Sequence, residues 1–147
     1  MKNFFFILAL LFTVSSLQAQ DLTSEMTALG DAWKAAFERG DASALAELYA
    51  EKVEFVNEDG SVSTVTRADV EANWTRSFAA QTGTIEFADD MVAKLLSDGK
   101  ANTKGSFTQT MTNKETGEST TFKGRFDHHA VKVGDKWLLS RMKVTPQ

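Results

Sequence analysis

The chain of 147 residues contains no cysteine, and its only proline is Pro146. Without cysteine no disulfide can form, so core packing has to stabilise the fold. The same absence excludes the lipid anchor that some exported proteins carry on a cysteine directly after their signal. The chain also lacks internal repeats, linkers and low-complexity stretches. We therefore expect one compact domain.

Positive charge is scarce as well. The sequence has 16 Lys and Arg against 20 Asp and Glu, a formal net charge of −4, and its basic residues form no cluster. Nucleic acid demands concentrated positive charge opposite its phosphates. An anionic membrane surface makes the same demand. We therefore expect neither nucleic acid nor a membrane as a partner of the folded domain.

Cofactor and metal motifs are missing from the sequence. It contains no Ser-His-Asp arrangement, no glycine-rich phosphate loop and no nucleotide fingerprint. Its two histidines, His128 and His129, are neighbours. Neighbouring residues of a strand point to opposite faces, so both imidazoles cannot hold one ion. We expect no cofactor and no metal.

Residues 1–19 have the features of a cleavable secretory signal peptide. Lys2 supplies a positive start, residues 4–14 carry no charge, and small residues follow up to Ala19. This apolar run is only about half of the roughly 20 residues that a membrane-crossing helix needs. A buried N-terminal helix is the alternative, which the lack of a polar face disfavours. We expect cleavage after Ala19, which leaves residues 20–147 soluble in the periplasm or outside the cell.

Helical periodicity dominates the first half of the domain. Apolar residues recur at helical spacing from Leu22 to Phe37, with Thr23 or Ser24 as the expected N-cap and Gly40 at the C-terminal end.

Two shorter helices follow. Asp41 is placed to cap a second helix that includes Tyr49. Thr66, with Asp69 three residues later, has the pattern of a capping box and opens a third helix through Phe78.

Strands dominate the second half. Alternation and turn residues predict strands at 53–57, 91–96, 101–112, 120–133 and 137–144. Helices first and a strand meander after them indicate an α+β fold, with about three N-terminal helices packed on one face of a curved antiparallel sheet.

This order of elements is similar to that of the NTF2-like (cystatin-like) superfamily, which includes ketosteroid isomerases, SnoaL-like polyketide cyclases and DUF4440 domains. The resemblance covers nearly the whole domain. The segments that carry it are Trp33-Lys-Ala-Ala-Phe37, Gly40-Asp41, Leu48-Tyr49-Ala50, Val53-Glu-Phe-Val56, Gly124-Arg-Phe126 and Gly134-Asp-Lys-Trp137. It implies a cone-shaped apolar cavity between helices and sheet, and a homodimer formed through the outer face of the sheet.

A ketosteroid isomerase needs an aspartate base, a tyrosine and a protonated aspartic acid in that cavity. At the matching positions the chain has Asn57 for the base, Trp33 for the tyrosine and Asp127 for the acid. Asparagine accepts no proton at a useful pH, and an indole N–H exchanges none. The resemblance therefore does not extend to ketosteroid isomerisation.

Asp127 and His129 are the candidate catalytic residues. They share one face of a strand with Arg125, Val131 and Val133, and the valines indicate that this face turns to the core. In a closed cavity, desolvation would raise the pKa of the Asp127 carboxyl, and a paired His129 would oppose that rise. General acid–base chemistry is one interpretation. A charged cross-strand cluster that supports the sheet is the other.

Candidate ligand contacts come from helices and strands alike. The apolar ones are Trp33, Phe37, Tyr49, Phe55, Trp74 and Phe107. Aromatic residues at helical spacing are more often core than ligand contacts. Asn57 and Gln109 are candidate polar contacts in an apolar cavity. Asn57 can instead cap the turn that follows it, and Gln109 can instead face solvent.

Three functions stay open at this point. The first is an exported domain that binds a small, largely apolar molecule. The second is an isomerase-, cyclase- or dehydratase-type enzyme that uses Asp127 and His129. The third is a structural or protein-binding dimer whose cavity is filled by its own side chains.

Overall fold

A computed structural model describes the backbone of residues 4–147 and the side chains of residues 19–147. The start of the predicted signal peptide, residues 1–3, lies outside the described residues. The helices are α1 (Phe4–Arg39), α2 (Ala42–Ala46) and α3 (Arg67–Ala80). The strands are β1 (Tyr49–Val56), β2 (Val62–Thr66), β3 (Gln81–Phe87), β4 (Val92–Ser97), β5 (Lys100–Asn113), β6 (Ser119–Val133) and β7 (Lys136–Pro146).

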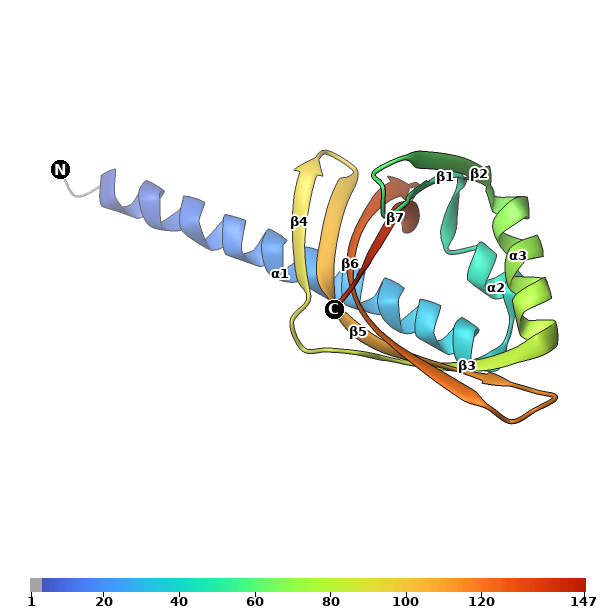
Figure 1. Ribbon diagram of the computed structural model, residues 1–147. Helices are drawn as coiled ribbons and strands as arrows, with labels where there is room; N and C mark the ends of the chain where they lie inside the picture. Colours follow the sequence, from blue (N-terminus) through green and yellow to red (C-terminus); the bar gives the residue numbers. More distant parts are fainter. Residues whose placement is uncertain (1–3) are drawn as a thin grey trace.

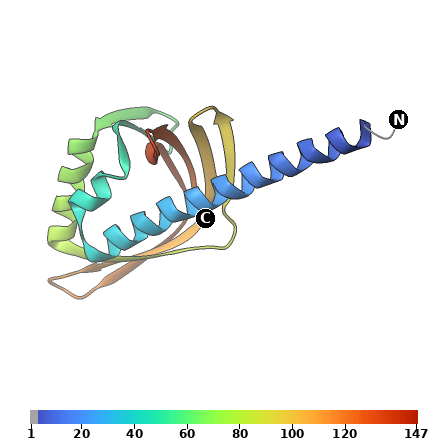
Figure 2. The ribbon, with the colours of Figure 1, turned by 180° about the vertical axis from the view of Figure 1, so that it is seen from behind.

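One continuous helix, α1, begins the described chain. Its first turns project beyond the sheet, and its C-terminal half crosses the sheet (Figures 1 and 2). The predicted N-cap at Thr23 or Ser24 is wrong, because the Thr23 hydroxyl lies inside the helix and donates to the Ala19 carbonyl. Gly40 ends the helix at a φ of 66°, as predicted. Among the described residues, no helix combines the length and apolar composition needed to cross a membrane.

The caps of the two shorter helices are confirmed. Asp41 Oδ1 accepts a hydrogen bond from the Ala44 N–H at the start of α2. Thr66 and Asp69 form the capping box at the start of α3, with both reciprocal bonds present. The second helix is shorter than predicted, however, and Tyr49 begins β1 instead of belonging to α2.

Seven strands form one curved sheet in the order β2-β1-β7-β6-β5-β3, with β4 also paired to β5. The expected antiparallel arrangement is correct for every pair except β1 and β7, which run parallel. Two strands, β2 and β3, were not predicted. β2 lacks alternation because nearly all its residues are exposed, and β3 follows α3 at Gln81 without a turn residue.

The helices cover the concave face of the sheet, which is the face that carries Phe107, Phe126 and Leu139. These side chains form a buried cluster with Phe37 of α1 and Phe78 of α3. A smaller cluster joins α1 to the other end of the sheet through Leu22, Met26, Ala101 and Ala130.

Three strand glycines make room for aromatic rings on the concave face. A Cβ at Gly83 would lie 2.6 Å from Phe37 Cε1 and 2.9 Å from Met111 Sδ. Gly105 leaves the same kind of space for Phe126, and Gly124 for Phe107 and Phe122. The Phe37 ring of α1 can therefore approach the backbone of β3 directly, and rings of β5 and β6 can lie across the neighbouring strand.

Gly83→Ala is expected to lower the free energy of unfolding by about 2 kcal/mol, because a methyl group would overlap the Phe37 ring. Gly30→Ala in α1 is the matched control, since its Cβ would approach nothing closer than 4.0 Å. That variant should gain about 0.5–1 kcal/mol from helix propensity. Urea denaturation of both variants measures the difference, and equal stabilities would contradict the packing argument.

Candidate functional site

The strand β6 divides its side chains between two environments. Phe126 and Ala130 are buried on the concave face, and the position between them on that face is His128. Asp127 and His129 therefore lie on the convex face, away from the helices. The prediction that their face turns to the core is wrong. Val133, which suggested it, is 58% exposed.

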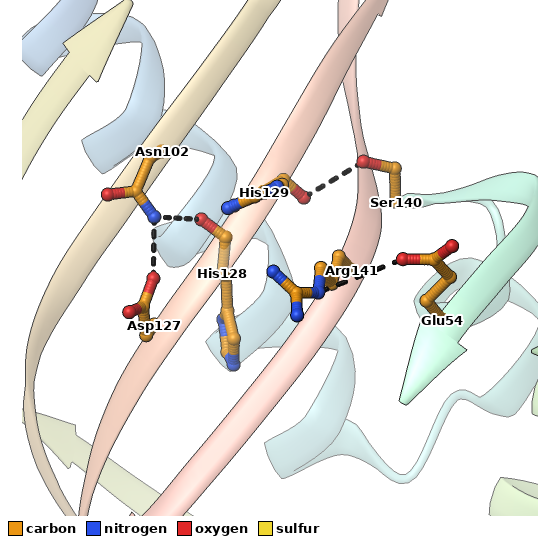
Figure 3. A network of polar contacts seen from close by, with 7 residues as sticks. All are labelled: Glu54, Asn102, Asp127, His128, His129, Ser140 and Arg141. Atoms are coloured by element: carbon orange, nitrogen blue, oxygen red, sulfur yellow. Dashed lines mark hydrogen bonds and ion pairs between the residues drawn. The ribbon is translucent and has the colours of Figure 1, made fainter. Parts of the chain in front are cut away.

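Asp127 belongs to a polar network on the convex face (Figure 3). Asn102 Nδ2 donates to Asp127 Oδ1 at 2.6 Å and to the His128 carbonyl at 3.0 Å. Lys104 Nζ lies 3.1 Å from Asp127 Oδ2. These contacts correspond to the second interpretation of Asp127, a charged cluster that joins β5 to β6.

The pKa of Asp127 lies below its ordinary value. Desolvation is the largest single influence and raises this pKa, but the hydrogen bonds from Asn102 and Lys104 and the charges of Lys104 and His129 together outweigh it. The carboxyl therefore stays ionised at neutral pH. A role for Asp127 and His129 in proton transfer stays a prediction, now on the convex face.

His128 is a polar side chain on the face of the sheet that the helices cover. It lies opposite Thr103 of β5, and its ring centroid is 5.2 Å from that of Phe126. Its Nε2 is buried and has no hydrogen-bond partner in the described part of the chain. The convex network does not include this imidazole (Figure 3).

Burial governs the protonation of His128. Desolvation lowers the pKa of this imidazole to about 4, against the opposing charge of Asp127. At neutral pH His128 is therefore uncharged. A neutral imidazole with a free ring nitrogen can accept or donate one hydrogen bond, depending on its tautomer.

A second group of predicted site residues meets around the hydroxyl of Tyr49. Trp33 Nε1 donates to the Tyr49 oxygen at 2.9 Å. The Trp33 ring stacks on Phe37 and meets Trp74 edge-on, with centroid distances of 5.0 and 5.9 Å. Burial raises the pKa of Tyr49 to about 12, although indole hydrogen bonds from Trp33 and Trp74 oppose the rise. The phenol is therefore protonated at any physiological pH.

The remaining predicted contacts divide between the interior and the surface. Phe107 is buried, and Phe55 is half-buried against the same cluster. Gln109 lies opposite the buried Ile85, so it faces the helices and its solvent-facing alternative is wrong. Asn57 is exposed and donates to the Ser61 hydroxyl at 2.8 Å, as its alternative as a turn cap predicts.

The structure describes a pocket outside this interior. It is an open region of about 690 Å³ along α1, and all the residues that line it belong to that helix, among them Thr23, Thr27 and Asp31. The predicted cavity between the helices and the sheet stays a prediction, as does the homodimer.

Sequence reasoning missed His128 as an interior residue. The signal available was the alternation of Gly124, Phe126 and Ala130, which places His128 on their face. The valines on the other face, Val131 and Val133, gave an equally apolar pattern and concealed it.

Comparison with known proteins yields one family and many structures. A family model for SnoaL-like domains matches residues 20–143. A search of curated protein sequences finds no match.

Three solved structures illustrate the likeness. A candidate calcium/calmodulin-dependent protein kinase II association domain from Xanthomonas campestris is 25% identical, with a TM-score of 0.66 over 84% of this chain and 86% of that one. A candidate scytalone dehydratase from Novosphingobium aromaticivorans is 12% identical, with a TM-score of 0.75 over 85% and 83%. A candidate dehydratase of the NTF2-like family from Streptomyces avermitilis is 15% identical, with a TM-score of 0.73 over 88% and 98%. The two dehydratase candidates share the fold alone.

The burial of His128 predicts a pH-dependent stability. The pKa of about 4 in the folded protein lies below the unfolded value near 6.5, so the unfolded chain binds the extra proton first. The contribution of neutral His128 to the free energy of unfolding is constant above pH 6.5. It is lost as the pH falls toward 4, by about 3 kcal/mol in total. Urea denaturation between pH 4 and 7.5 measures this loss.

Two variants isolate the His128 contribution from that of the carboxylates. His128→Phe should flatten the dependence between pH 6.5 and 4, whereas His129→Phe on the convex face should keep it. A slope that survives in His128→Phe would contradict the assignment.

Proposed function

The chain belongs to the SnoaL-like domain family of the NTF2-like superfamily, whose members bind small molecules or act as isomerase- or dehydratase-type enzymes, and we propose that it binds a small, largely apolar molecule between its helices and the concave face of its sheet.

One observation carries this proposal, the unpartnered Nε2 of His128. A buried polar atom without a hydrogen bond costs about 1–3 kcal/mol, so folded proteins rarely leave one unless a ligand or water occupies the place. A ligand hydroxyl that donates to Nε2 recovers this cost. We therefore infer a ligand with a hydroxyl group, which can donate to this nitrogen or accept from it, whichever tautomer is present.

The aromatic side chains of the interior indicate the rest of the ligand. Phe126 lies beside the imidazole. Trp33, Phe55 and Trp74 pack against the same core while remaining partly exposed, so they offer ring surface that the fold does not itself consume. Aromatic side chains of this kind favour flat, apolar partners through offset and edge-to-face contacts. We infer a flat hydroxylated ring compound.

Proton transfer is a second candidate function, and it too centres on His128. A neutral imidazole with a free nitrogen is the commonest general base in proteins. The positions that matched the ketosteroid isomerase base and tyrosine do not supply one, because Asn57 caps a turn and the Trp33 N–H is committed to Tyr49. An isomerase or dehydratase reaction in this domain would therefore run through His128, in place of the Asp127 and His129 pair.

Binding of phenol and toluene tests the proposal, because these probes have nearly the same size and differ in the hydroxyl. Phenol should bind about tenfold more tightly, the value of one hydrogen bond of ordinary strength. His128→Phe should abolish the preference, and His129→Phe should retain it. Quenching of tryptophan fluorescence measures both affinities. A preference that survives in His128→Phe would contradict the proposed site, and failure of both probes to bind would favour the filled cone.

We also propose that the chain is exported and that residues 1–19 are removed. The charge-free run of residues 4–14 supports this proposal, and cleavage after Ala19 leaves the helix residues that pack on the sheet in place. Leu22 and Met26, both buried, follow the cleavage site.

Expression of the full chain in a Gram-negative host tests export. Mass spectrometry of the periplasmic fraction should find residues 20–147. Leu10→Arg, which places a charge in the apolar run, should retain the uncleaved chain in the cytoplasm, whereas Thr23→Arg beyond the cleavage site should not. Cytoplasmic, full-length protein in the unmodified chain would refute the proposal.

A further inference from the structure

The convex face of the sheet gathers basic side chains that are scattered along the sequence. Asp127 and His129 mark this face of β6, and alternation places Lys123 and Arg125 on it as well. Residues that are level with one another on neighbouring strands share a face, so the strand pairings extend it to β4, β5 and β7. Six of the basic residues that share it make up what we call the basic face: Lys94, Lys104, Lys123, Arg125, Arg141 and Lys143.

Negative charge is sparse on the same face. Arg141 Nε lies 3.7 Å from Glu54 Oε2 (Figure 3), and Lys104 Nζ lies 3.1 Å from Asp127 Oδ2. The other four members of the basic face form no salt bridge with any residue whose side chain the structure describes. The whole chain carries a net charge of −4, so positive charge is concentrated on this face and the excess of negative charge lies elsewhere.

The basic face is open to solvent and carries no large ring. All its members except Arg141 are exposed. Phe122 and Phe126 alternate with its residues on β6 and therefore point to the concave side. Stable protein–protein interfaces place aromatic residues at their centre and few charges there. Proteins that bind single-stranded nucleic acid stack its bases on aromatic rings. The composition of the basic face therefore disfavours both kinds of partner.

Exposed valines flank the basic face at both ends of one row of residues. Val62 of β2 is level with Val56 of β1, which is level with Lys143. At the other end of the row, Val92 of β4 is level with Lys104. Val62 and Val92 are 51% and 65% exposed. A phosphate backbone offers such side chains no apolar contact, whereas the interface of a lipid bilayer accepts basic and apolar side chains together.

We propose that the basic face docks the domain on an anionic phospholipid surface, with the helices turned away from the bilayer. Five of its six members lie on β5, β6 and β7, the inner strands of the sheet, and a convex surface meets a flat one at its middle. The attraction is the sum of dispersed charges, each of which strengthens binding about fivefold near such a surface. This inference is independent of the ligand proposed for the interior.

The proposal departs from two expectations drawn from the sequence. A membrane was not expected as a partner, because residues 94–143 contain no run of basic residues; the pairing of strands brings these side chains together. The family resemblance implied a homodimer through this face. An isologous contact would set the basic face opposite a second copy of itself, and the excess of positive charge opposes that arrangement.

Co-sedimentation with lipid vesicles tests the proposal. The purified chain should bind vesicles of phosphatidylcholine with about 30% phosphatidylglycerol about a hundredfold more tightly than pure phosphatidylcholine at low salt. The preference should vanish at about 0.5 M NaCl, where the charges are screened over a few ångströms. Any contribution of the apolar residues 4–14 is common to both kinds of vesicle, so the ratio of the two affinities reports the basic face.

Two double variants locate the contact. Lys123→Gln with Lys143→Gln should lower the preference for anionic vesicles about 25-fold, a factor of about five for each charge removed. Arg39→Gln with Arg76→Gln is the matched control, because it removes the same charge from exposed positions on α1 and α3. That variant should keep the preference of the unmodified chain. All four positions are exposed, and thermal denaturation checks that both variants are folded.

Four results would overturn the proposal. The first is equal binding to anionic and neutral vesicles, and the second is an equal loss of preference in the two double variants. The third is binding to double-stranded DNA at low salt without a preference for anionic vesicles, which would identify nucleic acid as the partner. The fourth is a dimer, measured by light scattering, that only Lys123→Gln with Lys143→Gln alters, because a second copy would then cover the basic face.

Discussion

The structure depends on close contact between bulky rings and a strand backbone that has no side chain in the way. Phe37 of α1 can reach the sheet only because Gly83 lies beneath it, and Gly105 of β5 leaves room for the ring of Phe126 from the neighbouring strand β6. The contact of Phe37 with Gly83 sets how closely α1 approaches β3, and the interior that holds the candidate site lies between that helix and the sheet.

Local chemistry made much of the fold predictable. The Thr66 and Asp69 capping box, the Asp41 cap and the left-handed Gly40 are each decided within a few residues, and each was predicted. The order of helices and strands sufficed to indicate the family. The parallel pairing of β1 with β7 could not be predicted, because it depends on the path of the chain between segments about 90 residues apart, such as Tyr49 and Leu139.

The candidate site was predicted less well than the fold. Trp33, Tyr49, Phe55, Trp74 and Phe107 were placed in the interior correctly, since large rings at regular spacing are buried whatever they do. Asp127 was placed on the wrong face of the sheet. Neighbouring strand residues point to opposite faces, and the residue on the core face is His128. Both faces of β6 carry apolar residues, so alternation alone could not choose between them. Only the contacts of Ala130 with α1 decide the matter.

Neighbouring histidines in this chain have different surroundings as a result. His128 lies beside Phe126 on the concave face, where desolvation keeps it neutral, whereas His129 lies on the convex face next to the charged Asp127 (Figure 3). Asp127 affects both faces of the sheet. It forms a salt bridge with Lys104 on the convex face, and its charge opposes the fall in the pKa of His128 on the concave face. The two faces of the sheet are thus coupled through a single peptide segment.

The position of β7 has a consequence for how the molecule is assembled. Of the strands that the structure describes, β7 is the last in chain order, yet it lies between β1 and β6, near the middle of the sheet. The hairpin of β1 and β2 has no sheet to join until residues 136–146 arrive. Contacts between such distant segments form late and slowly. A nascent chain whose residues 136–146 have not yet been synthesised is therefore kept from completing its sheet, a property that would suit the export that we propose.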